Sequence, residues 1–505
     1  MPKNYVKRLA EGTTIVLLFS IIGALLGYGL RVILTKILSI QDFGFFFSIM
    51  AFTGLFSIFR ELGLSQALVK YLPEFRYKKE YGKIKASILL NIYIQLALTL
   101  IIFLPIIFFA DDISKLYFNN PAIATPLKII SISSILSILM VAVRPVFQGF
   151  EKMIEYSIIE PVRLVIVITL ILLFPFSGLI DVSIAYLISA GLVSLISFIL
   201  LLRIIPLIKI KSAKFSDVSK LLFSFAIPTM ITGIGYAILN YMDTLMLLYF
   251  RNPTEVGLYQ VALPTSQWLL YFMTAFTIVL FPVISELWAK KQKETLSSSL
   301  SMMVKLSFVF LIPLSLIFIA FPEIILRMLF TETYVSAAHA LQLLAIGTIF
   351  YSLASIFMVF INATGKPKLN TYTILIAAIL NVFMNLILIP VYGATGTAFA
   401  TAATFFFMLA ASAYFLRRNM PYSIPLFDIS KTLFIGITTL LFIFIIKGML
   451  NIDAWLEAFV VLSISLVIYI TLTIKMKIIR QAEMDVIKKA GIPVPEILEK
   501  IILKD

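Results

Sequence analysis

Long apolar stretches follow one another along the chain and are separated by short polar segments. A helix needs about 20 apolar residues to cross the hydrocarbon core of a bilayer. Because lipid offers no partner to backbone N–H and C=O groups, repeated runs of this length predict helices and not a strand barrel. The predicted fold is an all-α polytopic membrane protein. Its fourteen predicted spans are 13–37, 43–68, 86–110, 124–148, 154–176, 180–203, 217–249, 255–284, 297–321, 335–362, 368–390, 394–416, 429–448 and 453–474.

Lysine and arginine residues gather in alternate segments between these spans. Cytoplasmic loops carry an excess of such cations, so the alternation orients the chain. It predicts a multi-pass protein of the cell membrane with both termini in the cytoplasm, which agrees with an even number of spans. The cation-rich segments contain Arg76, Lys78, Lys79, Lys83 and Lys85; Lys152; Lys209, Lys211, Lys214 and Lys220; Lys290, Lys291 and Lys293; Lys366 and Lys368; and Arg417 and Arg418.

The chain contains an internal repeat, in which residues 13–203 resemble residues 220–417. The segment Asp42-Phe43-Gly44 matches Glu255-Val256-Gly257 at an offset of 213 (255 − 42). Each unit holds six spans, an even number, so both units enter the membrane from the same side and an axis along the membrane normal relates them. The predicted regions are a six-helix bundle in 1–210, a second six-helix bundle in 211–420, an additional helix pair in 421–475 and a cytoplasmic tail in 476–505.

Composition narrows the classes of function. Hydrophobic residues make up 61% of the chain and charged residues 13%, and the net charge is +15. Since the cations punctuate the apolar runs and do not form one basic face, the charge predicts no nucleic-acid partner. The chain has no cysteine and one histidine, His339, which argues against disulfides and against a metal cluster or other cofactor.

Several motifs together resemble a known family. They are the D/E-x-G segments at 42–44 and 255–257, Gly63-Leu64 followed by Ala67, and Gly365-Lys366 after the tenth span. With two six-span units and an added pair, the chain is similar to the polysaccharide (O-antigen and lipid-linked oligosaccharide) flippase branch of the multidrug/oligosaccharidyl-lipid/polysaccharide exporter superfamily. The resemblance implies two bundles around a central cavity, which carry polyprenyl-pyrophosphate-linked oligosaccharides from the cytoplasmic to the outer leaflet of the bilayer.

Two ionisable residues lie deep in the predicted spans. An ionisable group inside a span costs about 2.5–3.5 kcal/mol on insertion scales, so it normally faces a cavity or a partner. Arg31 lies in the outward half of the first span, and the repeat places Asp243 one residue from the equivalent position in the seventh. We expect them to pair across the cavity as a gate or coupling site.

A second group of charges lies near the predicted cytoplasmic mouth. Arginine holds phosphate oxygens with two parallel hydrogen bonds, which suits a pyrophosphate headgroup. We therefore expect those of Arg31, Arg60, Arg144 and Arg163 that face the cavity to attract that headgroup. The alternative is that the inner arginines reach the interface as anchors and that one pair is an ordinary i, i+3 contact. The inner group consists of Arg60, Glu61, Arg144, Glu160 and Arg163.

Two other functions compete with flipping. One is a Na⁺- or H⁺-coupled multidrug antiporter of the same superfamily, with Asp243 and Asn240 as its ion site. The other is a membrane-embedded glycosyl transferase or ligase, which ranks last because the predicted outer loops are short and Asp111-Asp112 is their only acidic pair. An arginine-rich cavity would repel the organic cations that the antiporters export, and fourteen spans exceed the twelve typical of that branch. The sequence thus predicts a flippase and not an enzyme.

Overall fold

The computed structural model describes residues 3–174, 178–205, 209–270, 284–420, 422–447, 449 and 454–480. Every regular element in these ranges is a helix, which confirms the all-α prediction. Twelve helices there are long and apolar enough to cross a membrane. Large apolar side chains lie exposed along them, such as Phe434 at 63% and Phe459 at 71%, as lipid-facing positions require. The chain is a multi-pass membrane protein.

The helices have these bounds in chain order: α1 (Lys3–Ile37), α2 (Ile40–Glu61), α3 (Leu64–Tyr77), α4 (Tyr81–Phe108), α5 (Ala110–Leu116), α6 (Ala124–Leu136), α7 (Ile138–Gly149), α8 (Met153–Leu173), α9 (Leu179–Ile204), α10 (Ser216–Phe250), α11 (Pro253–Ser266), α13 (Lys293–Ala320), α14 (Pro322–Leu329), α15 (Ala338–Ala363), α16 (Pro367–Asn419), α17 (Leu426–Ile446) and α18 (Ala454–Lys475). Short 3-10 helices lie at Pro121–Ile123 and Glu332–Ala337.

Two predicted spans are joined in α16, which is 53 residues long. Gly393 interrupts it with φ 54° and ψ −132°, and leaves two helical stretches, 367–392 and 394–419, that match the predicted spans 368–390 and 394–416. The predicted span 255–284 lies partly outside the described residues, since only α11 and residues 267–270 and 284 of it are described. The count of fourteen spans stays a prediction.

The prediction that the second span, 43–68, ends at residue 68 is wrong. Helix α2 stops at Glu61 because Leu62 and Gly63 adopt left-handed conformations, with φ of 48° and 74°. A side chain at Gly63 would collide with the backbone of Ala226 and lie 2.5 Å from the Thr229 hydroxyl oxygen. The apolar pattern runs through this break without a signal, since the break depends on contact with α10.

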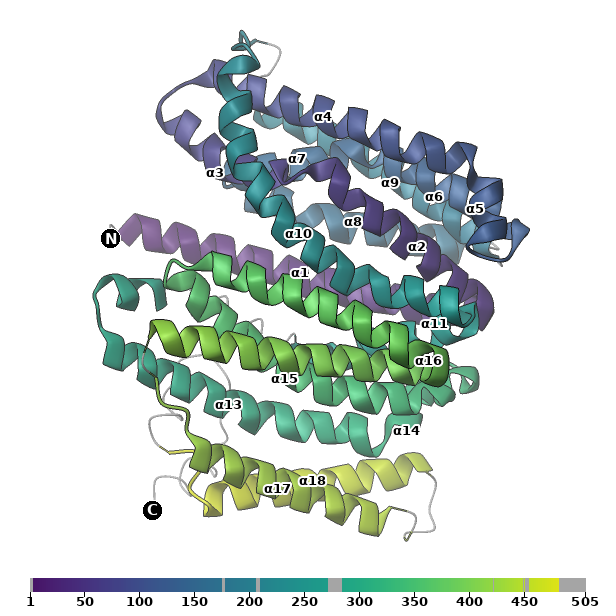
Figure 1. Ribbon diagram of the computed structural model, residues 1–505, viewed down its shortest axis with the longest axis vertical. Coiled ribbons are helices and arrows are strands. Elements are labelled where there is room, and N and C mark those ends of the chain that lie inside the picture. The colour runs from purple at the N-terminus through teal and green to yellow at the C-terminus, as the bar shows by residue number, and fades with distance from the viewer. Residues whose placement is uncertain are drawn as a thin grey trace. The chain divides into compact units, whose positions relative to one another are not determined.

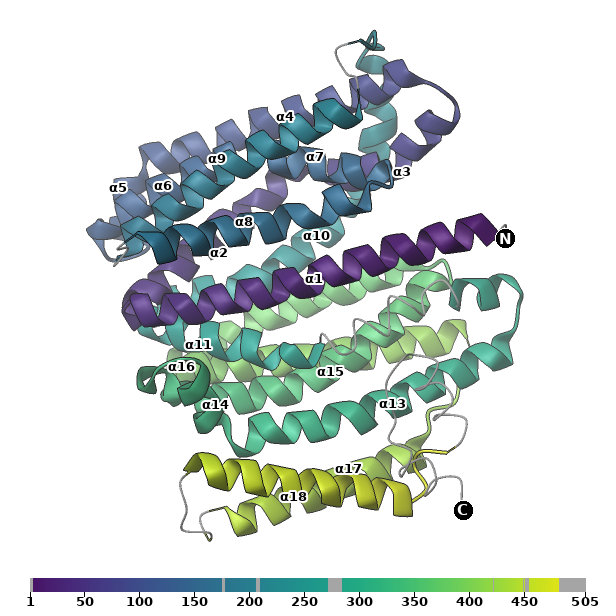
Figure 2. The ribbon, with the colours of Figure 1, turned by 180° about the vertical axis from the view of Figure 1, so that it is seen from behind.

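The chain forms two compact units. The first comprises residues 1–260 and 374–397. In it α2 packs against α10, α6 against α9, and α8 against α1 and α9 (Figures 1 and 2). Its core includes Leu64, Leu68, Phe147, Val193 and Leu222, all at most 1% exposed.

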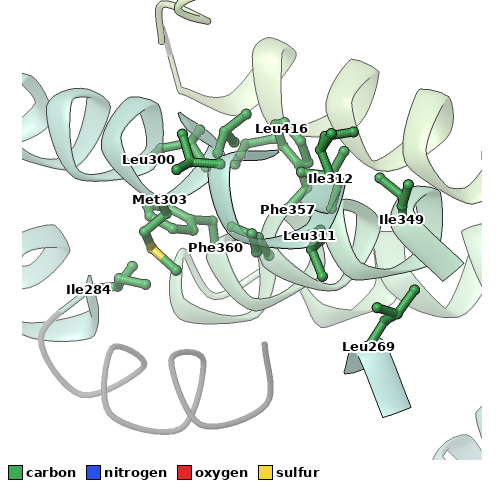
Figure 3. Close-up of a cluster of buried hydrophobic side chains, with 14 of the residues drawn as sticks. Leu269, Ile284, Leu300, Met303, Leu311, Ile312, Ile349, Phe357, Phe360 and Leu416 are labelled. Carbon is green, nitrogen blue, oxygen red and sulfur yellow. The ribbon is translucent and has the colours of Figure 1, made fainter. Parts of the chain in front are cut away.

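The second unit comprises residues 261–373 and 398–505. In it α13 packs against α15 and α17, and α17 packs against α18. Figure 3 shows its core, in which Leu300, Leu311, Phe357 and Phe360 lie together. The predicted domain boundaries at 210, 420 and 475 remain predictions, and residues 481–505 of the predicted tail lie outside the described residues.

Candidate functional site

All seven predicted substrate or gating residues, and Asn240, lie in the first unit. Asp243 of α10 is the most deeply buried of the acids among them, at 2% exposure. Its Oδ2 accepts a hydrogen bond of 2.6 Å from the Tyr259 hydroxyl, and its Oδ1 accepts one of 2.6 Å from the Asn385 amide. A buried carboxylate is tolerated only where such donors replace water. These two hydrogen bonds give each carboxylate oxygen of Asp243 a donor in the interior.

A pair of asparagines in α16 completes this polar group. Asn381 and Asn385 are at most 1% exposed and lie one turn apart, and the Asn385 amide also donates to Asn381 Oδ1 at 3.1 Å. Asn385 Oδ1 is buried and has no hydrogen-bond partner in the structure. Carboxylate and amide oxygens are the ligands that a hard cation prefers. If the Asn385 amide turned over, it would present this oxygen to the space beside Asp243.

Arg31 of α1 is held by α11. Its Nη1 donates to the backbone oxygen of Gln260 and, at 2.9 Å, to Gln260 Oε1. Its guanidinium lies 4.0 Å from the centre of the Phe47 ring, at cation–π distance. The Gln260 amide in turn donates to the Thr244 hydroxyl at 2.6 Å.

Arg31 and Asp243 thus contact consecutive residues of α11, Gln260 and Tyr259. The predicted gate between the two charges stays a prediction. Asn240, the predicted partner of Asp243 at an ion site, is exposed, and its amide donates to the Tyr236 carbonyl at 2.8 Å. The amide that the structure places on the Asp243 carboxylate is Asn385.

The inner arginines differ in how their donors are used. Arg60 of α2 is 7% exposed, and its Nη1 donates to the Ser134 carbonyl at 3.3 Å. Arg144 of α7 lies 4.8 Å from the centre of the Tyr156 ring. In both residues the Nε atom is buried and makes no hydrogen bond in the structure. Since an unmade hydrogen bond to a buried charged group is costly, both arginines are suited to receive oxygens from a ligand.

The acids of the inner group have local partners. Arg163 and Glu160 form the i, i+3 ion pair that the sequence offered as the simpler interpretation, with Nη2 2.5 Å from Oε1. The Arg163 guanidinium also lies 5.5 Å from the centre of the Tyr186 ring. Glu61 accepts a hydrogen bond of 3.0 Å from the Ser65 hydroxyl. Arg163 is therefore already compensated, whereas Arg60 and Arg144 keep a free donor.

The fourth predicted span, 124–148, contains a break between α6 and α7 that the apolar pattern does not indicate. Ser194 of α9 inserts its hydroxyl between α6 and α7: Oγ donates to the Leu136 carbonyl at 2.6 Å and accepts from the Met140 N–H at 3.4 Å. A side chain inserted in this way into the i→i−4 ladder bends a helix. At this break the Ser134 carbonyl accepts hydrogen bonds from the Ser137 hydroxyl at 2.8 Å and from Arg60 Nη1 at 3.3 Å. The available signal was the serine cluster at 131–137 inside an apolar run.

The neutral partners Tyr259, Gln260 and Asn385 were not predicted from the sequence. Among the described residues, no group of three or more His, Cys, Asp or Glu side chains is arranged to hold a metal ion. Asp243 combines one carboxylate with the neutral side chains of Tyr259 and Asn385. Such a set suits a weakly bound, exchangeable ion better than a resident metal.

Comparison with known proteins gives two matching family models. One, described as polysaccharide biosynthesis protein, matches residues 9–288. The other, described as MatE, matches residues 228–387.

Individual proteins resemble the chain over most of its length. An uncharacterized membrane protein of Methanocaldococcus jannaschii is 29% identical, over 96% of this chain and 99% of that protein. A probable low-salt glycan biosynthesis flippase of Haloferax volcanii, Agl15, is 24% identical, over 88% of this chain and 91% of that protein. A solved structure of the lipid II flippase MurJ in an inward closed conformation has a TM-score of 0.74 and 19% identity, over 90% of this chain and 98% of that chain. The last similarity shows a shared fold.

Proposed function

The chain belongs to the polysaccharide biosynthesis protein family, and we propose that it moves lipid-linked oligosaccharides from the cytoplasmic to the outer leaflet of the cell membrane by alternating access. The resemblance to the multidrug/oligosaccharidyl-lipid/polysaccharide exporter superfamily is confirmed by both family models and by the shared fold. The Haloferax volcanii relative named as a glycan biosynthesis flippase supports the choice of cargo.

Arg60 and Arg144, whose buried Nε atoms lack a hydrogen-bond partner, carry the proposal. A pyrophosphate linking a sugar to its lipid offers several charged oxygens, and arginine keeps its charge at any cellular pH. These two residues therefore bind the headgroup, while Arg163 stays with Glu160. In the orientation that the cation alternation predicts, with both termini in the cytoplasm, this group would face the cytoplasm.

Asp243 is the proposed coupling residue. The Asn385 amide donates to Asp243 Oδ1, and the oxygen of the same amide has no hydrogen-bond partner in the structure. Na⁺ or H⁺ can therefore replace the amide hydrogen at the Asp243 carboxylate. The proposed activity is transport without bond making or breaking, and the chain acts as a carrier and not as an enzyme.

Reconstitution in liposomes tests the proposal. Purified protein is inserted with a fluorescently labelled polyprenyl-pyrophosphate oligosaccharide, and movement between leaflets is scored by quenching from outside. We expect movement well above that in protein-free liposomes. The proposal fails if the protein is folded and the label does not move.

A cation-coupled multidrug antiporter is the second candidate. The MatE model covers residues 228–387, which include Asp243 and both asparagines of its polar group. Export of a labelled organic cation by the same liposomes, without movement of the glycolipid, would favour this candidate.

A further inference from the structure

The two D/E-x-G motifs are not used by the proposed function. Each opens a helix in the same way, with a capping residue three positions before the acid. Ser39 Oγ accepts from the Asp42 N–H at 3.1 Å, and Asn252 Oδ1 accepts from the Glu255 N–H at 3.0 Å. The capping residues are 213 positions apart (252 − 39), as the acids are (255 − 42). The repeat therefore preserves the whole first turn of α2 and of α11.

The glycines of the motifs pack against each other's helix. A Cβ atom at Gly44 would overlap the carbonyl oxygen of Pro253 and lie 2.7 Å from its carbonyl carbon. A Cβ atom at Gly257 would lie 2.8 Å from the carbonyl oxygen of Ile40. Both offsets are again 213 (257 − 44 and 253 − 40). Each glycine thus meets the residue four positions before the other glycine, which makes the contact reciprocal, like a twofold interface.

Only glycine permits this contact. In both cases the group in the way is a backbone carbonyl, which cannot rotate aside as a flexible side chain would. Glycine allows backbones to approach to the distance of a Cα–H···O contact. The neighbouring residues Phe43 and Val256 are both fully buried. The two helix ends therefore close on each other without a gap for a β-carbon.

The two acids differ in their partners. Glu255 Oε2 accepts from the Ala394 N–H at 2.7 Å, at the Gly393 turn of α16. Arg251 donates to the Pro390 carbonyl at 3.2 Å, on the same turn. Asp42 accepts a hydrogen bond of 2.8 Å from the Ser39 hydroxyl of its own turn. The beginning of α11 is thus hydrogen-bonded to α16, whereas Asp42 of α2 is hydrogen-bonded to the N-cap residue of its own helix.

We propose that Gly44 and Gly257 form the closing contact of a gate, closed in this structure, between the beginnings of α2 and α11. The gate opens when α2 separates from α11 and the α16 turn fastened to it. By the distribution of cations this end of the helices faces outward. The inference rests on the proposed function only in that alternating access requires this end to open.

Spin labels test the gate without any substrate. The chain has no cysteine, so Gln41→Cys and Thr254→Cys give two labelled sites at equivalent repeat positions (254 − 41 = 213). Overpacking disfavours the closed state, so Gly44→Ala should lower the ratio of short to long label distances by roughly 10-fold or more. Gly257→Ala should act in the same direction but less, since its obstacle lies farther away. An unchanged distance distribution in both variants would overturn the proposal.

Gly29→Ala is the matched control, because a Cβ there meets nothing within 4 Å. It should leave the distances unchanged. If Gly44→Ala does not fold, a short bis-maleimide bridge between the two introduced cysteines decides. The bridge uses both thiols, so its readout is transport: the bridged protein should not flip glycolipid, and flipping by fully bridged protein would refute the gate. Absence of flipping in unbridged, unsubstituted protein would instead count against the proposed function.

Discussion

The two polar groups of the first unit use their hydrogen bonds differently. Asp243 is an acid, and each of its carboxylate oxygens accepts a hydrogen bond from a neutral residue of another helix: Tyr259 of α11 and Asn385 of α16. At Arg60 and Arg144 the charges are cations, and each keeps one buried nitrogen that makes no hydrogen bond in the structure. The carboxylate of Asp243 is hydrogen-bonded within the protein, whereas Arg60 and Arg144 each have a nitrogen without a protein partner.

From this difference we propose two ligands of opposite charge. An acid beside a neutral amide can exchange the hydrogen bond from that amide for a small cation. Arginines with an unpaired donor are stabilised when the oxygens of an anion reach them. Separate sites for ion and headgroup are what coupled transport of an anionic lipid requires.

Asp243→Asn should abolish the response to the coupling ion. The amide keeps the size of the side chain but loses the charge that a cation needs. An ion present at about 100 times its Kd stabilises the folded state by about 2.7 kcal/mol, so the rise in Tm on adding Na⁺ or on lowering pH should disappear. Asn240→Ala is the control, since Asn240 is exposed and bonded to its own helix. A full ion response in Asp243→Asn would remove Asp243 from coupling.

Arg60→Ala and Arg144→Ala should each weaken glycolipid binding without changing the response to the ion. A hydrogen bond to a charged group contributes about 1.5–3 kcal/mol, which corresponds to roughly 10- to 150-fold in Kd. Arg60→Lys should lie between, because lysine keeps the charge and loses the planar fork.

The measurement for these arginine variants is binding of a labelled glycolipid in detergent, together with the Tm shift with Na⁺. Arg203→Ala, at an exposed arginine in the last turn of α9, should bind as the unsubstituted protein does. Equal losses of glycolipid affinity in Arg60→Ala, Arg144→Ala and Arg203→Ala would show a general effect of positive charge and not a headgroup site.

Hydropathy predicted most spans within a few residues; for example, the predicted span 180–203 corresponds to α9, Leu179–Ile204. This works because lipid exposure and burial both require apolar residues, so each span stands out locally. The breaks at Leu62 and Ser137 could not be predicted in the same way. They arise from contacts with α10 and α9, and the apolar pattern passes through both.

The charged members of the site were found for a related reason. Ionisable residues are rare in spans, so Arg31, Arg60 and Asp243 were visible in the sequence. Their neutral partners were not, since a glutamine or tyrosine in a span attracts no notice until the fold places it. Asn381 and Asn385, one turn apart in an apolar run, were the one local signal available.

Ser194→Ala should reduce glycolipid affinity by a smaller factor. Without the hydroxyl, the Met140 N–H and the Leu136 carbonyl can bond to each other, and the straightened helix withdraws the Ser134 carbonyl from Arg60. A hydrogen bond of this kind contributes about 0.5–1.5 kcal/mol, or roughly 2- to 12-fold in Kd. Amide exchange around Met140 should slow at the same time.

The control for Ser194→Ala is Ser197→Ala, whose hydroxyl is buried and without a partner in the structure. It should leave both affinity and exchange unchanged. In the double variant Ser194→Ala/Arg60→Ala the affinity should equal that of Arg60→Ala alone, because the serine acts through the arginine. Additive losses would show that Ser194 contributes by another route.

Glu160→Gln should have the smallest effect on glycolipid affinity. It tests whether Arg163, which is paired with Glu160, differs from Arg60 and Arg144. An i, i+3 pair contributes about 0.2–0.5 kcal/mol, and Glu160 is 35% exposed, so solvent screens the interaction. Kd should change by less than about 3-fold, toward tighter binding, because Arg163 gains donors for the headgroup. A loss of binding as large as that of Arg60→Ala would mean that the ion pair, and not the open arginines, forms the headgroup site.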